Sequence, residues 1–396
     1  MIDAVAGGIL DESHWVDLKQ ELGKGRDKNT DLAIDLASLA IDGGLLVIGV
    51  EDRQSRAGTV CGVQLAGLAD RVDHVARGRV HPPLMVRCVE LEDPAKPGHG
   101  CLLIHIPPSP QAPHMIDHVY YGRGDRGNRK LGDEEVRAIL SVRAQQHDDV
   151  SSQLRRLAAD DPVPAQDRRN GHLYLVAQPL ATRDDVMVEL LTAPDFMNRM
   201  LAITNGISQN IGNNYFWPTI EVATRRSRRA EGVALTSYSG NDHIRESGMI
   251  DLLVKEDAGV SLICGRGTDV VKPDAMADPA SVLQAVVVLG LTHSVLTLAG
   301  RLADHYAAYQ GQWIVGVRLD RLKDVVPYEH VLSLGGDFGN PYSRDEYERV
   351  TTTTTAELVD QAPAVVERLF GPLLRGLGID SRYLPYSTES LRKSPP

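Results

Sequence analysis

The chain has 396 residues, of which 42% are hydrophobic, and carries 42 Lys and Arg against 53 Asp and Glu, a formal net charge of −11. This is the composition of an ordinary soluble globular protein, and it excludes collagen, wholesale disorder and a disulfide scaffold. The length predicts two or three domains, each with its own core. The acidic balance argues against non-specific coating of nucleic acid, but a local basic groove stays open because the field depends on where the charges lie.

Cysteine spacing and the N-terminus bear on the compartment. The four cysteines are scattered without a CxxC pair, so neither a zinc site nor a disulfide framework is predicted. No basic segment followed by an apolar one opens the chain, so we expect a cytoplasmic protein. The apolar stretch 281–300 is interrupted by polar residues such as Gln284 and His293. It therefore predicts a buried helix of a soluble domain, with no membrane partner.

Hydrophobic period and turn residues predict an α+β unit over residues 1–147. Asn29 and Thr30 offer a helix cap, and Leu32, Leu36 and Leu39 form one apolar stripe after them. The expected elements, in chain order, are a strand at 15–22, a helix from 29 to 41, a strand at 45–50, a helix at 66–79, strands at 84–91, 101–106 and 118–121, a Gly/Arg loop at 122–132 and a helix at 134–146.

A second α+β domain of unknown role is expected over 171–385, after a charged linker at 148–170 and before a disordered tail at 386–396. Its expected strands lie at 172–178, 217–224, 232–238, 250–254, 260–264 and 313–319, and its helices at 184–192 and 279–309.

Four residues near the first strand form a candidate acidic site. Asp17 and Lys19 are two apart on a predicted strand, so both project from one face about 7 Å apart. Asp52 ends the neighbouring central strand, where it can converge with Asp17, and Glu12 lies just upstream of the first strand. Three carboxylates beside a lysine fit a nuclease that holds Mg²⁺ or Mn²⁺, in which the metal activates water and the lysine stabilises the transition state. The alternative is solvated acids with a surface salt bridge.

A second candidate site is the basic segment 120–130. Its glycines spell GxGxxG, but no strand–helix–strand context surrounds them, and no P-loop sequence occurs in the chain. A basic loop beside tyrosines suits a polyanion, with phosphates on the cations and a base stacked on an aromatic ring; a solvated turn is the alternative. The candidate nucleic-acid-binding residues are Tyr121, Arg123, Arg126, Arg129 and Lys130.

Two further patterns are weaker. His114 and His118 flank Asp117 with a spacing that could bind a transition metal on a helix, but Pro113 favours a loop. The run Arg225–Arg229 lies between two predicted strands, which favours a solvated hairpin tip, with a second phosphate contact as the alternative.

Taken in order, several of these features resemble the Schlafen AlbA-type domain family over residues 10–145. The ordered features are Glu12 with Asp17-Leu18-Lys19, the run from Ile41 through Gly43-Gly44 to Glu51-Asp52, Ile106-Pro107-Pro108-Ser109, Pro113-His114, Tyr120-Tyr121-Gly122-Arg123-Gly124 and Asp133-Glu134-Glu135.

The resemblance implies an N-terminal mixed sheet with helices and a nucleic-acid-binding function. Family members that cleave tRNA and rRNA use three metal-binding acids, which would correspond here to Glu12, Asp17 and Asp52, with Lys19 beside them. Glu51 competes with Asp52 for the third position. The family usually has Glu where this chain has Asp17, and the shorter side chain could move the metal or abolish turnover.

Two classes of function therefore stay open. One is a nucleic-acid-binding protein that acts as a metal-dependent endoribonuclease on structured RNA such as tRNA, in which case RNA is the expected partner rather than DNA. The other is a transcriptional regulator or ATP-binding protein whose second domain senses a ligand or partner. Self-association into a homo-oligomer is left open by the sequence.

Overall fold

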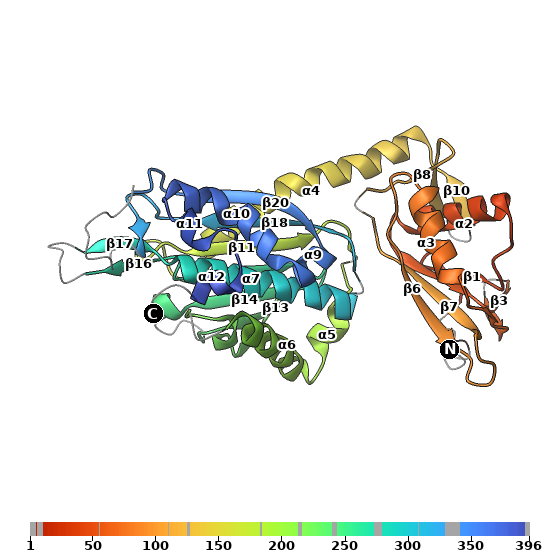
Figure 1. The fold of residues 1–396 in the computed structure, drawn as a ribbon, viewed down its shortest axis with the longest axis horizontal. Coiled ribbons are helices and arrows are strands. Elements are labelled where there is room, and N and C mark those ends of the chain that lie inside the picture. The colour runs from red at the N-terminus through yellow and green to blue at the C-terminus, as the bar shows by residue number, and fades with distance from the viewer. Residues whose placement is uncertain are drawn as a thin grey trace. The chain divides into compact units, whose positions relative to one another are not determined.

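The structure is a computed structural model. It describes residue 5 and residues 11–392, apart from 55, 110, 125–126, 183, 213–215, 240–243, 273–278, 308 and 329–340, and it does not describe the side chains of residues 142–148. The chain divides into an N-terminal unit, 1–146 with 180–183 and 308–312, and a C-terminal unit formed by the rest. Both units contain helices and sheets, so the α+β class is confirmed (Figure 1).

The N-terminal unit is built on a mixed five-stranded sheet. β1 and β2 run parallel with α2 as their crossover, and β7 pairs antiparallel with β2, β5 and β6. The elements are β1 (Val16–Lys19), α2 (Arg26–Leu39), β2 (Gly44–Ile48), β5 (Val63–Gln64), α3 (Leu68–Gly78), β6 (Arg87–Glu92) and β7 (His99–Ile106).

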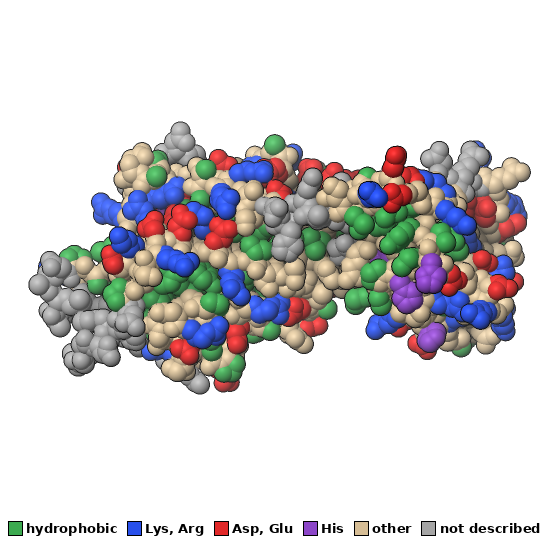
Figure 2. Space-filling view, turned by 90° about the horizontal axis from the view of Figure 1, so that it is seen from above, with side chains coloured by type: hydrophobic (Ala, Val, Ile, Leu, Met, Phe, Trp, Pro, Cys, Tyr) green, Lys and Arg blue, Asp and Glu red, His purple; other side chains and the backbone are tan. Residues whose placement is uncertain are grey.

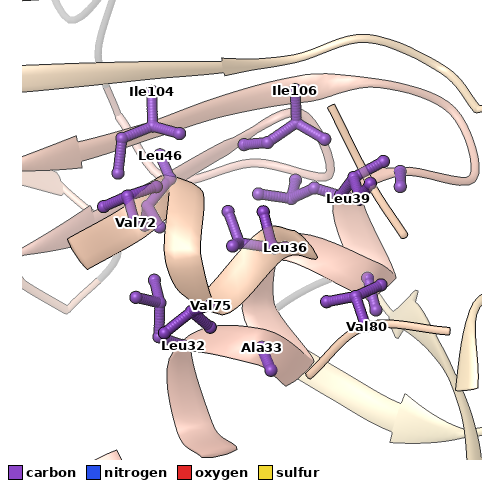
Figure 3. Close-up of a cluster of buried hydrophobic side chains, with 14 of the residues drawn as sticks. Leu32, Ala33, Leu36, Leu39, Leu46, Val72, Val75, Val80, Ile104 and Ile106 are labelled. Atoms are coloured by element: carbon purple, nitrogen blue, oxygen red, sulfur yellow. The ribbon is translucent and has the colours of Figure 1, made fainter. Parts of the chain in front are cut away.

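One face of this sheet carries the main core of the unit. Alternate strand residues such as Leu46 and Ile104 meet the apolar stripe of α2 and the residues Val72 and Val75 of α3, all almost fully buried (Figure 3). The stripe predicted on α2 is therefore confirmed. The helix begins earlier than predicted, at Arg26 after Gly25, so Asn29 and Thr30 lie inside it rather than at its cap.

Three more strands and a hairpin complete the unit. β3 pairs with β4, and the second small sheet has the order β10-β9-β8. The Gly/Arg segment expected as a loop is a hairpin, because β9 and β10 pair antiparallel from Tyr121 with Lys130 to Gly124 with Gly127. The remaining elements are β3 (Val50–Arg53), β4 (Arg56–Val60), β8 (Met115–Ile116), β9 (Val119–Gly124), β10 (Gly127–Lys130) and the start of α4 (Asp133–Ala159). From residue 147 on, α4 belongs to the C-terminal unit, and there it covers the start of the expected linker.

The C-terminal unit centres on a seven-stranded sheet of order β12-β13-β14-β15-β11-β18-β20. Helix α7 packs against β11 and β15 and is itself contacted by α6, α9 and α10. The strands are β11 (Leu173–Pro179), β12 (Arg225–Arg229), β13 (Gly232–Thr236), β14 (Ile250–Lys255), β15 (Val260–Cys264), β18 (Gln312–Leu319) and β20 (Tyr347–Thr354). A small sheet has β16 (Thr268–Val271), β17 (Ala280–Leu283) and β19 (Val326–Pro327). The helices are α5 (Val188–Thr192), α6 (Phe196–Ile211), α7 (Ala285–Leu302), α9 (Thr355–Asp360), α10 (Ala362–Gly376), α11 (Asp380–Tyr383) and α12 (Thr388–Arg392).

The apolar stretch around residue 290 is a core helix, as predicted. Within the described part of the chain, one helical segment, Ala285–Ala307, is long and apolar enough to cross a membrane, and 89% of its apolar window is buried inside the structure. A helix that is apolar on every side fits burial in the core of a large domain.

Several expectations for the C-terminal unit are wrong, among them that residues 279–309 form one helix, since residues 280–283 form the strand β17. Residues 217–224 do not form a strand, since Pro218 has no N–H to donate and a 3-10 turn, η2 (Ile220–Val222), follows it. The run Arg225–Arg229 is not a hairpin tip but the edge strand β12, where charged side chains protect an open sheet edge. The segment 386–392 is not a disordered tail, because Tyr386 and Leu391 are buried and α12 is formed.

Candidate nucleic-acid interface

A buried ion network joins β1, α2 and the β9–β10 hairpin. On β1, Asp17 and Lys19 share one face as predicted, and the Lys19 Nζ donates to Asp17 Oδ1 at 2.9 Å. The same Nζ lies 3.5 Å from Oδ2 of Asp35 on α2. Burial lowers the pKa of Lys19, but the carboxylates of Asp35 and Asp17 outweigh it, so the pKa lies above its ordinary value. Lys19 is therefore a fixed cation between two acids.

Arg123 is the second cation of this network, and its placement corrects the prediction that it contacts nucleic acid. Its Nη1 donates to Asp17 Oδ2 at 2.8 Å, and its Nη2 donates to the carbonyls of Ser13 and Val16. The side chains of Arg123 and Asp17 are only 4% and 6% exposed. A buried arginine whose nitrogens bind a carboxylate and two carbonyls holds the hairpin against β1 and does not reach a phosphate.

Asp35 is a functional candidate that the sequence analysis missed. Burial raises the pKa of Asp35 to about 6, against the lowering effect of Lys19. Its Oδ1 accepts from Nδ2 of Asn128 on β10 at 2.6 Å, and Asn128 in turn accepts from the Ser38 hydroxyl. A signal was present in the sequence, because an aspartate three residues after Leu32 falls beside the apolar stripe of the helix.

The predicted metal site is not assembled. Glu12 accepts a hydrogen bond from the Leu18 N–H at 3.3 Å, and its pKa is raised by burial first and by Asp17 and Asp52 after it. Glu12 is therefore influenced by both of the other carboxylates, yet the described residues hold no group of three His, Cys, Asp or Glu that could bind a metal ion. The physical reason is that Asp17 is already neutralised by Arg123 and Lys19, while Asp52 lies on the exposed part of β3.

Glu51, the competitor of Asp52, has partners of its own. Its Oε2 accepts from Arg53 Nε at 2.9 Å and from the Thr59 N–H at 3.3 Å. It therefore belongs to the β3–β4 hairpin and not to the network around Asp17.

Exposed cations remain on β10. Lys130 is exposed, and its cross-strand neighbour is the half-buried Tyr121, which packs on the main core. Arg129 is exposed and makes a bidentate ion pair with Glu135 at the start of α4, at 2.6 and 2.9 Å. The pair is exposed to solvent, so a phosphate that binds Arg129 would compete with Glu135 for the same guanidinium. Arg126 lies outside the described residues.

The histidine pair does not form a site. His114 is fully buried, and its Nδ1 is 2.7 Å from the carbonyl of Pro82. His118 is exposed in the turn between β8 and β9, where it and Asp117 have positive φ angles of 67° and 46°. The loop alternative is therefore correct.

Positive and negative side chains of the described residues alternate over the surface and do not form one large region of a single sign. In the face shown in Figure 2, Lys and Arg side chains are interspersed with Asp and Glu over both units. With this pattern and the net charge of −11, attraction of a polyanion has to come from a short-range cluster of cations.

Comparison with known proteins relates most of the N-terminal unit to one domain family. Residues 12–132 match the family model described as Schlafen, AlbA_2. Over these residues the chain is similar to the Schlafen AlbA_2 domain family. This match confirms the predicted resemblance, leaves the C-terminal unit outside it, and associates the domain with nucleic-acid-related functions.

The other comparisons add little. None of the curated proteins matches the chain. Among solved structures, the crystal structure of the DIP2311 protein from Corynebacterium diphtheriae matches with 18% sequence identity and a TM-score of 0.24, over 35% of this chain and 27% of that chain. The chain thus spans about a quarter of that protein, and the likeness is too slight to bear on fold or function.

Proposed function

We propose that the AlbA_2 domain binds nucleic acid through the exposed cations of β10 without cutting it. The observation that supports this most is that Arg129 and Lys130 are exposed on a hairpin that Arg123 and Asn128 fix to β1 and α2. A rigid hairpin presents its cations at little entropic cost, which favours phosphate contact.

The experiment measures affinity for a fluorescein-labelled RNA stem-loop, with single-stranded RNA and DNA of the same length in parallel, by fluorescence anisotropy. Lys130→Gln and Arg129→Gln should each weaken binding several-fold and equally across sequences, because phosphate contacts carry no base information. Lys96→Gln is the matched control, an exposed lysine on the turn between β6 and β7. Equal loss of affinity in the control, or unchanged affinity in the two variants, would remove the support for this interface.

The metal-dependent endoribonuclease stays as a second candidate on one observation, the electrostatic contact of Glu12 with Asp17 and Asp52. Mg²⁺ or Mn²⁺ would have to draw Asp17 away from Arg123 and Lys19. Purified protein incubated with total tRNA and Mn²⁺ tests this on a denaturing gel, with Asp52→Asn and Asp17→Glu beside the wild type. Cleavage that Asp52→Asn abolishes would favour the nuclease; intact tRNA with all three proteins would favour binding alone.

The regulator and ATP-binding hypotheses make no use of this acidic cluster. ATP added as a competitor in the anisotropy experiment tests the second of them. Displacement of RNA at ATP concentrations near the dissociation constant of ATP would indicate that ATP and RNA share a site.

A further inference from the structure

A single tryptophan projects from an otherwise buried segment of the C-terminal unit. Trp217 is 41% exposed, whereas Phe216, Pro218 and Thr219 on either side are buried. Phe216 packs against Gly290 of α7, where a Cβ would lie only 2.5 Å from the phenyl ring. The backbone under Trp217 is therefore anchored in the core, and its ring has a defined position at the surface.

Arginines from two other segments lie beside this ring. The Cζ atoms of Arg245 and Arg266 are each 5.8 Å from the ring centroid of Trp217. Arg266 is fixed, because its Nη1 donates to the Trp217 carbonyl at 2.7 Å and its Nη2 lies 3.0 Å from Asp269. Arg245 is exposed, and no acid in the described part of the chain forms an ion pair with it. Arg266 thus holds the tryptophan in place, and the guanidinium of Arg245 is available to bind a ligand.

The segment that carries Arg245 is itself held in place. Glu246, the first residue of the 3-10 turn η3 (Glu246–Gly248), accepts from the N–H groups of Arg169 and Asn170 at 2.8 and 2.9 Å. Its Oε1 also lies 3.0 Å from Nε2 of the buried His172. The carboxylate is thereby neutralised, and Arg169, whose backbone N–H it binds, has an exposed side chain. Gly248 closes against the indole, since a Cβ there would lie 2.6 Å from its Cη2 atom.

We propose that Trp217, Arg169, Arg245 and Arg266, the Trp217 surface, bind single-stranded nucleic acid, with a base stacked on the indole and backbone phosphates on Arg245 and Arg169. An exposed aromatic ring next to guanidinium groups offers both contacts that such strands use, stacking and charge. This site lies in the C-terminal unit and does not depend on the interface proposed for β10.

The open character of the surface favours a strand over a free nucleotide. A small-molecule site buries most of its ligand in a cleft, whereas Trp217, Arg169 and Arg245 are all exposed. A paired duplex hides its base faces in the stack and offers the indole nothing to stack on. An acidic protein partner would use the arginines and would not need the ring.

Quenching of tryptophan fluorescence tests the proposal directly. The chain has three tryptophans, and Trp313 is fully buried and out of reach of a stacked base, so in a Trp15→Phe protein a loss of fluorescence on binding reports on Trp217. Titration with a 12-nucleotide oligo(dT) or oligo(rU) should quench this signal in a saturable way. A 12-base-pair duplex and polyphosphate of equal charge should quench it little. By anisotropy, Trp217→Ala should weaken binding of the oligonucleotide about 5- to 150-fold, the range known for base–aromatic stacking. Trp217→Phe should recover most of that affinity.

Two controls separate this site from others and from misfolding. Arg245→Gln should weaken binding, whereas Arg349→Gln, on β20 at the other side of β11 and β18 from β15, should not. Lys130→Gln should leave the quenching of Trp217 intact, so failure of the β10 interface and failure of this one are distinguishable. Hydrogen exchange over β14 and β15 checks that each variant is folded. Equal quenching by polyphosphate, or unchanged oligonucleotide affinity in folded Trp217→Ala, would overturn the proposal.

Discussion

Removal of the Arg123 guanidinium should destabilise the N-terminal unit far more than loss of an ordinary surface charge. In Arg123→Gln, Asp17 keeps one cation, Lys19, but its Oδ2 loses a 2.8 Å ion pair inside the protein, and the carbonyls of Ser13 and Val16 lose their shared donor. Breaking a buried pair from one side costs about 3 to 5 kcal/mol. The hairpin should therefore open at much lower denaturant concentration than in the wild type.

The measurement is hydrogen exchange with mass spectrometry across a urea series, because a two-unit chain does not unfold in one step. Peptides from β1 and β9 should lose protection, whereas peptides from β14 and β15 should keep it. Lys28→Gln is the control, since Lys28 and Asp31 form an exposed pair, 58% and 59% accessible, whose removal should change stability by less than about 0.5 kcal/mol.

A double variant sharpens the test. Asp17→Asn with Arg123→Gln removes both charges of the pair, so it should cost less than the sum of the two single variants. Equal protection in Arg123→Gln and wild type, or simple additivity in the double variant, would refute the idea that this pair holds the hairpin.

Further predictions concern pH. A carboxyl whose pKa is raised in the folded state, as for Asp35 at about 6, makes the N-terminal unit lose stability as pH rises from about 4 to about 6, by about 3 kcal/mol in total; urea unfolding of Asp35→Asn should lack this slope, and an unchanged slope would assign it to another group. Burial lowers the pKa of His172, but Asp161 and Glu246 outweigh it and raise the pKa. The stability that protonated His172 contributes is present below pH 6.5 and is lost as pH rises through the folded pKa. The free energy of unfolding of the C-terminal unit should therefore decline above neutrality, and His172→Gln should lack this decline.

Local patterns predicted the core of the N-terminal unit well. The parallel strands around α2 and the stripe of leucines follow from hydrophobic period and from the turn at Gly43-Gly44, which act over a few residues. Asp17 and Lys19 meet on one face for the same reason, since strand alternation fixes it.

The roles of Arg123 and Asp35 depend on partners that no local pattern shows. Asp17 and Arg123 are 106 residues apart, and Asn128 and Asp35 are 93 apart. The glycine-rich segment holds several basic residues, and only the strand register of the folded hairpin determines which of them is buried. Alternation places Arg123 and Asn128 on the face toward β1 and α2, and Arg129 on the opposite face. Sequence analysis therefore found the segment and assigned one of its residues to the wrong side.

The Trp217 surface was missed for a different reason. Residues 217–224 look like a strand by composition, and Arg266, which binds the Trp217 carbonyl, lies 49 residues further along the chain, so no local pattern joins the ring to its arginines. In the structure the backbone register of β14 and β15 pairs Ile250 with Cys264 and so brings the segments of Arg245 and Arg266 to one end of the sheet. Long-range pairing of this kind sets the site.

The salt dependence of RNA binding tests the central claim most directly. Wild type and the Arg129→Gln/Lys130→Gln double variant are titrated with the same labelled stem-loop from low to moderate salt, and the logarithm of affinity is plotted against the logarithm of salt concentration. If β10 neutralises two phosphates, the slope of the double variant should be shallower by about 1.4 to 1.8, that is, by about 0.7 to 0.9 for each phosphate that is no longer neutralised. Parallel plots for the two proteins would contradict the proposed interface.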